Sequence, residues 1–176
     1  MTHVTLGIVA RRRETQNRWA PVSWAPSAVL PSAPETPAWT RIAAEGPEET
    51  WYVGPATLDL HPGETAHYRD NLGSGRPSVW VALRKRDERV EVASVSVDPY
   101  EGEALAGDEA LLLEALPMPP EVEALLAAFV AEFHVEREFF KRKRKPADPN
   151  ALARRPPRVL GLDEDGRGDP DRENEP

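Results

Sequence analysis

The chain has 176 residues, of which 19 are proline and none is cysteine, and its formal net charge is −8. The absence of cysteine excludes disulfide bonds, thiolate metal sites and a cysteine nucleophile, and the length favours one domain. No apolar run approaches the roughly 20 residues of a membrane-spanning helix, and Met1 to Ala10 lack the basic start and apolar stretch of a signal peptide. We therefore expect a cytoplasmic protein with no membrane partner.

The charge is divided into blocks along the chain. Residues 91–140 carry 12 acidic side chains and one basic one, whereas residues 141–160 carry eight basic side chains and one acidic one. This segregation favours partners of complementary charge over a uniform attraction to nucleic acid.

Short strands separated by proline and glycine are predicted for the first half of the chain. A β-branched, apolar run predicts an opening strand at residues 4–9. Residues 19–30 contain Pro21 and Pro26, so edge strands and turns are expected there, because proline cannot donate a hydrogen bond to a sheet. Further strands are expected at 39–42, 50–53 and 56–60, with a turn at Gly54-Pro55 between the last two. Residues 64–72 fit either a helical turn or an irregular strand.

The clearest strand lies at residues 78–86. Its alternation predicts one face made of Val79, Val81 and Leu83 and a second face made of Trp80, Ala82 and Arg84. A hairpin turn at Asp87-Glu88 leads to a return strand from Val90 to Val97. The apolar positions of that strand change phase, which predicts a bulge near Ala93-Ser94.

Helices are expected mainly near the end of the folded region. A short helix is predicted at 100–106, followed by a strand at 111–116 and an amphipathic helix at 120–134. The apolar stripe of the long helix has helical spacing and must be buried; it consists of Val122, Leu125, Leu126, Phe129, Val130 and Phe133.

These elements predict an α+β fold in one domain, residues 1–145. We expect an antiparallel, strongly bent sheet or partly closed β-barrel, capped by one C-terminal amphipathic helix, with a two-sheet sandwich as the alternative. Residues 146–176 are rich in proline, arginine and acidic residues, and are expected to be a disordered tail because they cannot bury enough apolar surface to offset the ordering entropy.

Motifs for catalysis or cofactor binding are weak. The spacing of His61, Glu64 and His67 suits one metal ion on neither a helix nor a strand. The Gly73-Ser74-Gly75 loop lacks the ending of a phosphate-binding loop, and the chain contains no Gly-x-Ser-x-Gly elbow. We therefore expect no enzyme activity, no catalytic residues, no metal and no cofactor.

Five consecutive cations form the strongest local motif, and two phenylalanines precede them. Such a cluster seeks solvent or anions, and three interpretations stay open. It contacts the phosphates of nucleic acid or of a phosphorylated cofactor, it contacts the chain's own acidic block from Glu121 to Glu138 or an acidic partner surface, or it is a solvated helix end. The predicted partner-binding residues are Phe139, Phe140, Lys141, Arg142, Lys143, Arg144 and Lys145.

Several short segments, in this order and spacing, carry a resemblance to a known family. They are residues 63–72, 77–84, 98–101, 117–119 and 129–136, the last continuing through Phe139 into the basic cluster. Together they resemble an uncharacterised proteobacterial domain-of-unknown-function family encoded beside formate dehydrogenase genes. Some relatives carry a molybdopterin-guanine-dinucleotide biosynthesis label, but a nucleotidyltransferase of that kind needs a glycine-rich nucleotide loop, which this sequence lacks. The family offers no agreed catalytic residues.

The resemblance implies a role in molybdoenzyme maturation. The function expected is that of a non-enzymatic accessory protein that binds a formate dehydrogenase subunit or a cofactor-insertion factor during assembly of the molybdenum-dependent enzyme. The alternatives are a nucleic-acid-binding module that uses the basic cluster 141–145, and a small enzyme that handles a nucleotide or cofactor.

Overall fold

The first sheet is built from the N-terminal half of the chain. The computed structural model describes residues 2–135. The strand order of this sheet is β2-β1-β4-β3, and all neighbouring pairs are antiparallel. Its strands are β1 (Thr2–Glu14), β2 (Val22–Leu30), β3 (Thr40–Glu45) and β4 (Glu48–Leu60).

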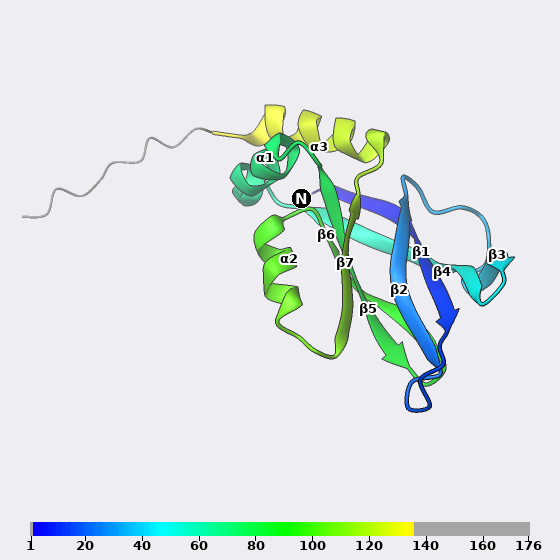
Figure 1. Cartoon of the computed structure of the whole chain (residues 1–176). Coiled ribbons are helices and arrows are strands. Elements are labelled where there is room, and N and C mark those ends of the chain that lie inside the picture. Colours follow the sequence, from blue (N-terminus) through cyan, green and yellow to red (C-terminus); the bar gives the residue numbers. More distant parts are fainter. Residues whose placement is uncertain (1, 136–176) are drawn as a thin grey trace, which may run out of the picture. The chain divides into compact units, whose positions relative to one another are not determined.

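The second sheet and the helices follow in the chain. The sheet has the order β6-β5-β7 and is also antiparallel. Its strands are β5 (Ser78–Arg86), β6 (Arg89–Ser96) and β7 (Leu111–Pro117). The helices are η1 (Pro62–Glu64), α1 (Thr65–Gly73), α2 (Pro99–Ala106) and α3 (Pro120–Phe133). Figure 1 shows α3 lying across one end of the strands with α1 beside it.

The α+β class is confirmed, but the expected single bent sheet capped by one helix is wrong. Residues 2–135 form two antiparallel sheets and three α-helices, without a closed barrel. Strand β2 approaches β7 and β4 approaches β6, yet no hydrogen-bonded ladder joins the two sheets. Local alternation fixes which face of a strand is buried, but it does not encode which distant edges pair. This is why the sequence could not separate a bent sheet from two sheets.

The predicted turn at Gly54-Pro55 is also wrong, because β4 runs straight through it. The register of β1 on β4 shifts between Ile8 and Val9, opposite Gly54, and Gly54 has a φ of 147° that only glycine adopts readily. Pro55 is tolerated because β3 pairs with β4 only up to Tyr52, so no neighbour on that side needs the missing N–H.

The core confirms the predicted buried face of the clearest strand and most of the predicted stripe of the long helix, whose Phe133 is instead 38% exposed. Val79, Val81 and Leu83 are fully buried, and the predicted bulge lies where Ala82 pairs with Ser94 and Leu83 with Val92. The buried stripe of α3 includes Phe129, whose ring centroid lies 6.2 Å from that of Tyr68 on α1. The open choice for residues 64–72 is settled in favour of helix α1.

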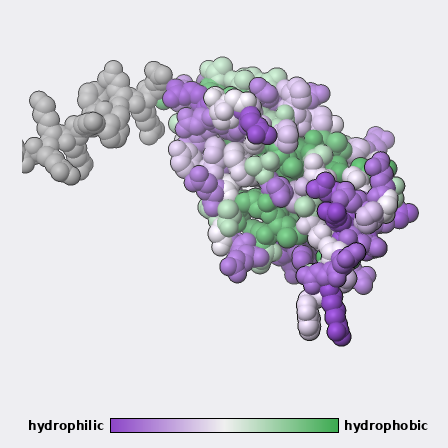
Figure 2. All heavy atoms as spheres, viewed as in Figure 1, coloured by the Kyte–Doolittle hydropathy of each residue, from purple (hydrophilic) through white to green (hydrophobic). Residues whose placement is uncertain are grey.

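Apolar side chains gather on one outer face of the molecule. Figure 2 shows an apolar area over β7, where Leu111 and Leu113 are only half-buried. The other face of β7 contributes Leu116 to the core, and Leu112 packs against it. Strand β7 therefore has one face in the core and leaves part of the other in contact with solvent.

Candidate functional site

The partner-binding residues predicted from the sequence lie outside the described residues. They are Phe139, Phe140, Lys141, Arg142, Lys143, Arg144 and Lys145. The candidate site within residues 2–135 is instead a cluster of tryptophans in the first sheet and the hairpin loop beside it, which we call the tryptophan end.

Three tryptophans that are far apart in the sequence meet at this end. Ring centroids are 5.7 Å apart for Trp24 and Trp39, 6.4 Å for Trp24 and Trp51, and 6.2 Å for Trp39 and Trp51. Strands β2 and β4 supply Trp24 and Trp51, and Trp39 lies just before β3. Edge-to-face and tilted packing at these distances is favourable for aromatic rings. The cluster is therefore a fixed structure and not a chance proximity.

Trp39 has a strained backbone. Its φ of 66° is rare for a bulky residue, and conformations of this kind cost on the order of 1–3 kcal/mol. The conformation is held by a 2.8 Å hydrogen bond that the Trp39 N–H donates to the Tyr52 carbonyl. The Arg89 guanidinium lies 5.2 Å above the Trp39 ring, within the range of a cation–π contact. Strain of this kind is typical of positions kept for function.

Glu49 links the tryptophan cluster to two arginines beside it. Its carboxylate accepts hydrogen bonds from Arg41 at 2.9 Å, from Arg12 at 3.2 Å and from the Trp51 Nε1–H at 3.1 Å. The hydrogen bond from Arg41, followed by that from Trp51, lowers the pKa of Glu49 below its usual value. The indole of Trp51 is thereby oriented by an ionised side chain.

The hairpin loop between β1 and β2 presents a further tryptophan to solvent. Trp19 is 90% exposed, and the Arg18 guanidinium lies 6.0 Å from its ring. The loop is braced by its own hydrogen bonds: the Trp19 N–H donates to Asn17 Oδ1 at 2.9 Å, the Ala20 N–H donates to the Asn17 carbonyl at 3.1 Å, and the Thr15 hydroxyl donates to the Ala20 carbonyl. The large apolar side chain therefore extends from a loop with a defined shape.

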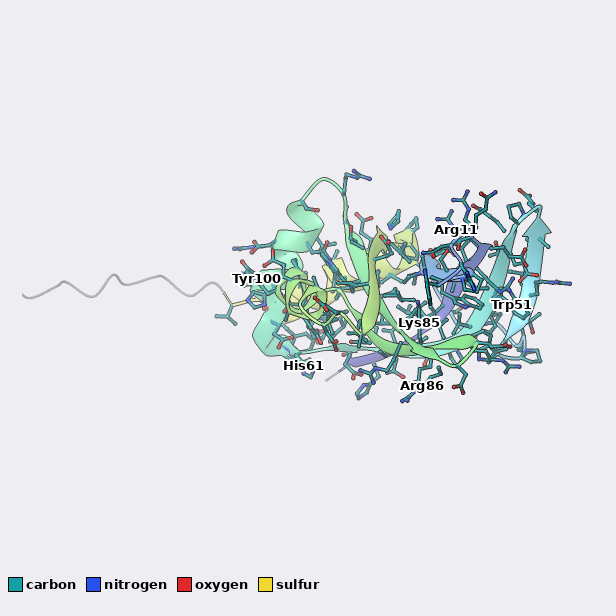
Figure 3. All side chains as sticks on the ribbon, turned by 60° about the horizontal axis from the view of Figure 1, so that its bottom comes forward. Arg11, Trp51, His61, Lys85, Arg86 and Tyr100 are labelled. Atoms are coloured by element: carbon teal, nitrogen blue, oxygen red, sulfur yellow. The ribbon has the colours of Figure 1, made fainter. Side chains whose placement is uncertain are left out.

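A hollow of about 430 Å³ lies beside Trp19, between this loop and the turn that joins β5 to β6. Trp24 is the buried aromatic residue in its wall. Figure 3 places Trp51 at the end of the molecule away from His61 and Tyr100, with Arg11 and Lys85 between them. The hollow is lined by Arg12, Trp19, Ala20, Pro21, Val22, Trp24, Lys85, Asp87 and Glu88. It thus combines an aromatic wall with charges of both signs.

A histidine–aspartate pair that the sequence did not indicate joins α1 to α2. His67 Nδ1 lies 2.7 Å from Asp98 Oδ2, and the buried Asp98 also caps α2 by accepting a 2.8 Å hydrogen bond from the Tyr100 N–H. Glu64, which shares a motif with His67 in the sequence, instead accepts a hydrogen bond from the Tyr68 hydroxyl at 3.1 Å. The two motif residues therefore engage different partners. The Asp98-Pro99 start of α2 was the available signal for this cap.

Comparison with known proteins places the chain in a family. Residues 5–144 match the model of a family described as a protein of unknown function (DUF3305). The chain belongs to the DUF3305 family. The match confirms membership of an uncharacterised family, and it covers the tryptophan end and most of the basic cluster. Neither the curated proteins nor the solved structures gave a match to this DUF3305 chain. None of the helices within residues 2–135 has the length and apolar character needed to cross a membrane.

Proposed function

We propose that this chain is a non-enzymatic accessory protein that docks a folded protein partner at the tryptophan end. The observation that carries the proposal is Trp19, which is 90% exposed on a braced loop beside an open hollow. Scattered exposed apolar residues are normal on protein surfaces. A tryptophan held in a defined position next to a hollow with an aromatic wall fits a binding surface better than it fits a chance exposed residue.

The surroundings of Trp19 have the anatomy of a protein interface. Tryptophan and arginine are the residues that most often dominate binding energy, usually inside a ring of polar groups that excludes water. Here Arg12, Lys85, Asp87 and Glu88 border the hollow. The strained backbone at Trp39 supports the same interpretation, because the fold maintains the tryptophan cluster against a conformational cost.

The ion pairs at this end favour a protein over nucleic acid. Arginines of β1, β3 and β5 are engaged by glutamates, at 3.4 Å for Arg13 and Glu48, 2.9 Å for Arg41 and Glu49, and 2.7 Å for Arg86 and Glu91. A phosphate backbone is bound by cations that release counterions, and these three arginines do this poorly because they are already paired with carboxylates. A protein surface with charges of both signs fits the rim better.

The identity of the partner is proposed from the sequence resemblance. The segments at residues 63–72, 77–84 and 98–101 resemble a family encoded beside formate dehydrogenase genes. The partner proposed is therefore a subunit of a molybdenum-dependent formate dehydrogenase or a factor that inserts its cofactor. The basic cluster 141–145 stays a predicted second contact.

Binding of the purified chain to the dehydrogenase subunits of the source organism tests this proposal. Trp19→Ala is compared with Ile42→Ala, which removes another exposed apolar side chain, 53% exposed, from β3. Loss of an interface hot spot costs about 2 kcal/mol or more, so we expect Trp19→Ala to weaken binding by roughly 30-fold or more. Ile42→Ala should bind as the unmodified chain does.

Each part of the proposal has its own contrary result. Because Ile42 lies on β3 beside the tryptophan cluster, equal weakening by Trp19→Ala and Ile42→Ala would show that Trp19 is not the binding hot spot proposed. Absence of binding to any dehydrogenase subunit or insertion factor, together with normal formate oxidation in a strain lacking the gene, would refute the proposed partner.

A further inference from the structure

A second hollow lies between α1 and α2, on a part of the molecule not used by the tryptophan end. Its volume is about 450 Å³. We call it the α1–α2 groove, and it is lined by Asp70, Asn71, Ser74, Arg76, Ser78, Trp80, Pro99, Tyr100 and Glu103. Segments 63–72, 77–84 and 98–101, which carry the family resemblance, supply most of this lining.

Buried contacts hold the floor of the groove in place. Asn71 is 2% exposed, and its amide N–H groups donate to the carbonyls of Ser78 at 2.8 Å and Val97 at 2.7 Å, while its oxygen accepts from the Ser78 N–H at 3.0 Å. Gly102 of α2 lies so close to Trp80 that a Cβ atom there would be 2.4 Å from the ring. Helix α2 therefore packs directly on the indole, and the floor is a preformed surface.

Two aromatic rings of the kind that attracts cations line the groove. Tyr100 is 56% exposed, and its ring packs on His67 with the centroids 4.5 Å apart. Trp80 on β5 is half-buried beneath Gly102. Faces of tryptophan and tyrosine attract ammonium and guanidinium groups. Both rings line the same hollow.

Carboxylates border these rings. Asp70 on α1 and Glu103 on α2 both line the groove, and neither forms an ion pair within residues 2–135. A neighbouring hollow of about 530 Å³ shares Arg76 and Ser78 with the groove and adds Glu123 of α3. Arg76 is the sole cation among the residues that line the two hollows.

The surface around the groove is also acidic. Residues 91–135, which include α2, β7 and α3, carry ten acidic side chains and no lysine or arginine. A surface of one sign raises the local concentration of an oppositely charged partner and accelerates its association. The carboxylates would repel an anionic ligand such as a nucleotide. Arg76 alone among the residues that line the two hollows could attract it.

We propose that the α1–α2 groove binds an extended, arginine- or lysine-rich segment of a partner protein. One cationic side chain of that segment lies on Tyr100 and Trp80 between Asp70 and Glu103. The rest of the segment follows the neighbouring hollow toward Glu123. This site is separate from the tryptophan end and does not depend on the function proposed there.

Titration of the full chain with a short fluorescent peptide tests the proposal. The probe alternates arginine with serine, and a matched peptide carries glutamate in place of arginine. We expect saturable binding of the arginine peptide, weakened by added salt, and no binding of the glutamate peptide. Trp19→Ala should bind the arginine peptide as the unmodified chain does, which separates this test from that of the docking surface.

Charge-matched variants locate the binding. Each surface ion pair contributes about 0.2–1 kcal/mol, so Asp70→Asn with Glu103→Gln should weaken binding by roughly 2- to 30-fold. Glu109→Gln with Glu132→Gln removes the same charge from exposed positions outside both hollows and should have little effect. Tyr100→Leu should weaken binding by roughly 2- to 5-fold through loss of the cation–π contact.

Three results would overturn the proposal. Equal weakening by both double variants would mean a general attraction to an acidic surface. Equal binding of the glutamate peptide would exclude recognition of cations. Binding that appears only after Lys141 to Lys145 are replaced by alanine would assign the groove to this chain's own basic cluster and not to a partner.

Discussion

Replacing Gly102 with alanine tests how closely α2 packs on the second sheet. The new Cβ would lie 2.4 Å from Trp80 Cδ1 and 2.6 Å from Trp80 Cγ and Nε1. No ordinary contact is that short, so either the indole or the helix must move. Inserting a methyl group into a packed interface costs about 1–3 kcal/mol. Alanine is favoured over glycine inside a helix by about 1 kcal/mol, so the expected net loss of stability is about 0–2 kcal/mol.

The matched control is Gly73→Ala at the end of α1. A Cβ at Gly73 would meet no atom within 4 Å, so this variant isolates the effect of replacing glycine with alanine in a helix. It should leave stability unchanged or raise it by up to about 1 kcal/mol. Urea unfolding, followed by circular dichroism, gives the change in unfolding free energy for both variants from the shift of the midpoint, provided that the m-value is unchanged. If Gly102→Ala is as stable as Gly73→Ala, Trp80 does not pack on α2 as described.

Three further predictions concern buried or ionisable groups. Asn71→Ala should lower the unfolding free energy by at least about 2 kcal/mol in urea titrations, because it leaves the Ser78 N–H and the carbonyls of Ser78 and Val97 without their partner. Burial raises the pKa of Tyr68 to about 12, so its contribution to stability is full below pH 10 and is lost as the pH rises toward 12. The unfolding free energy of Tyr68→Phe should therefore fall less steeply with pH in this range, and an equally steep fall would contradict this pKa. The pKa of Glu49 is lowered chiefly by Arg41, so the contribution of Glu49 to stability is present above the ordinary pKa of 4.5 and is lost as the pH falls below it. The unfolding free energy of Glu49→Gln should therefore depend less on pH in acid, and an unchanged pH dependence would count against the network of Glu49 with Arg41 and Trp51.

Patterns in the sequence predicted the elements whose buried faces are apolar. The alternation at residues 78–86 and the stripe at 120–134 correspond to β5 and α3, and the phase change in the return strand marks a real bulge. Helix α1 was left undecided because its buried face is largely polar. That face consists of Thr65, Tyr68 and Asn71, so hydropathy carries no helical period there.

The candidate site was missed because its residues come together only in the folded chain. Trp24, Trp39 and Trp51 are separated by prolines and loops, and the register of β1 with β2 and β4 brings their strands together. Four of the five tryptophans occur between residues 19 and 51, and that concentration was the available signal. It could not show that Trp19 lies in solvent while Trp24 is buried, since both lie in the same proline-interrupted segment.

The topology has a consequence for folding during synthesis. Every ladder of the first sheet joins strands between Thr2 and Leu60, and every ladder of the second joins strands between Ser78 and Pro117. Each sheet can therefore pair its own strands as soon as its own stretch has left the ribosome. Tyr68 and Phe129 meet only when α3 has emerged. Until then the apolar end of the core is uncovered in the nascent chain, and surface of this kind is prone to aggregation.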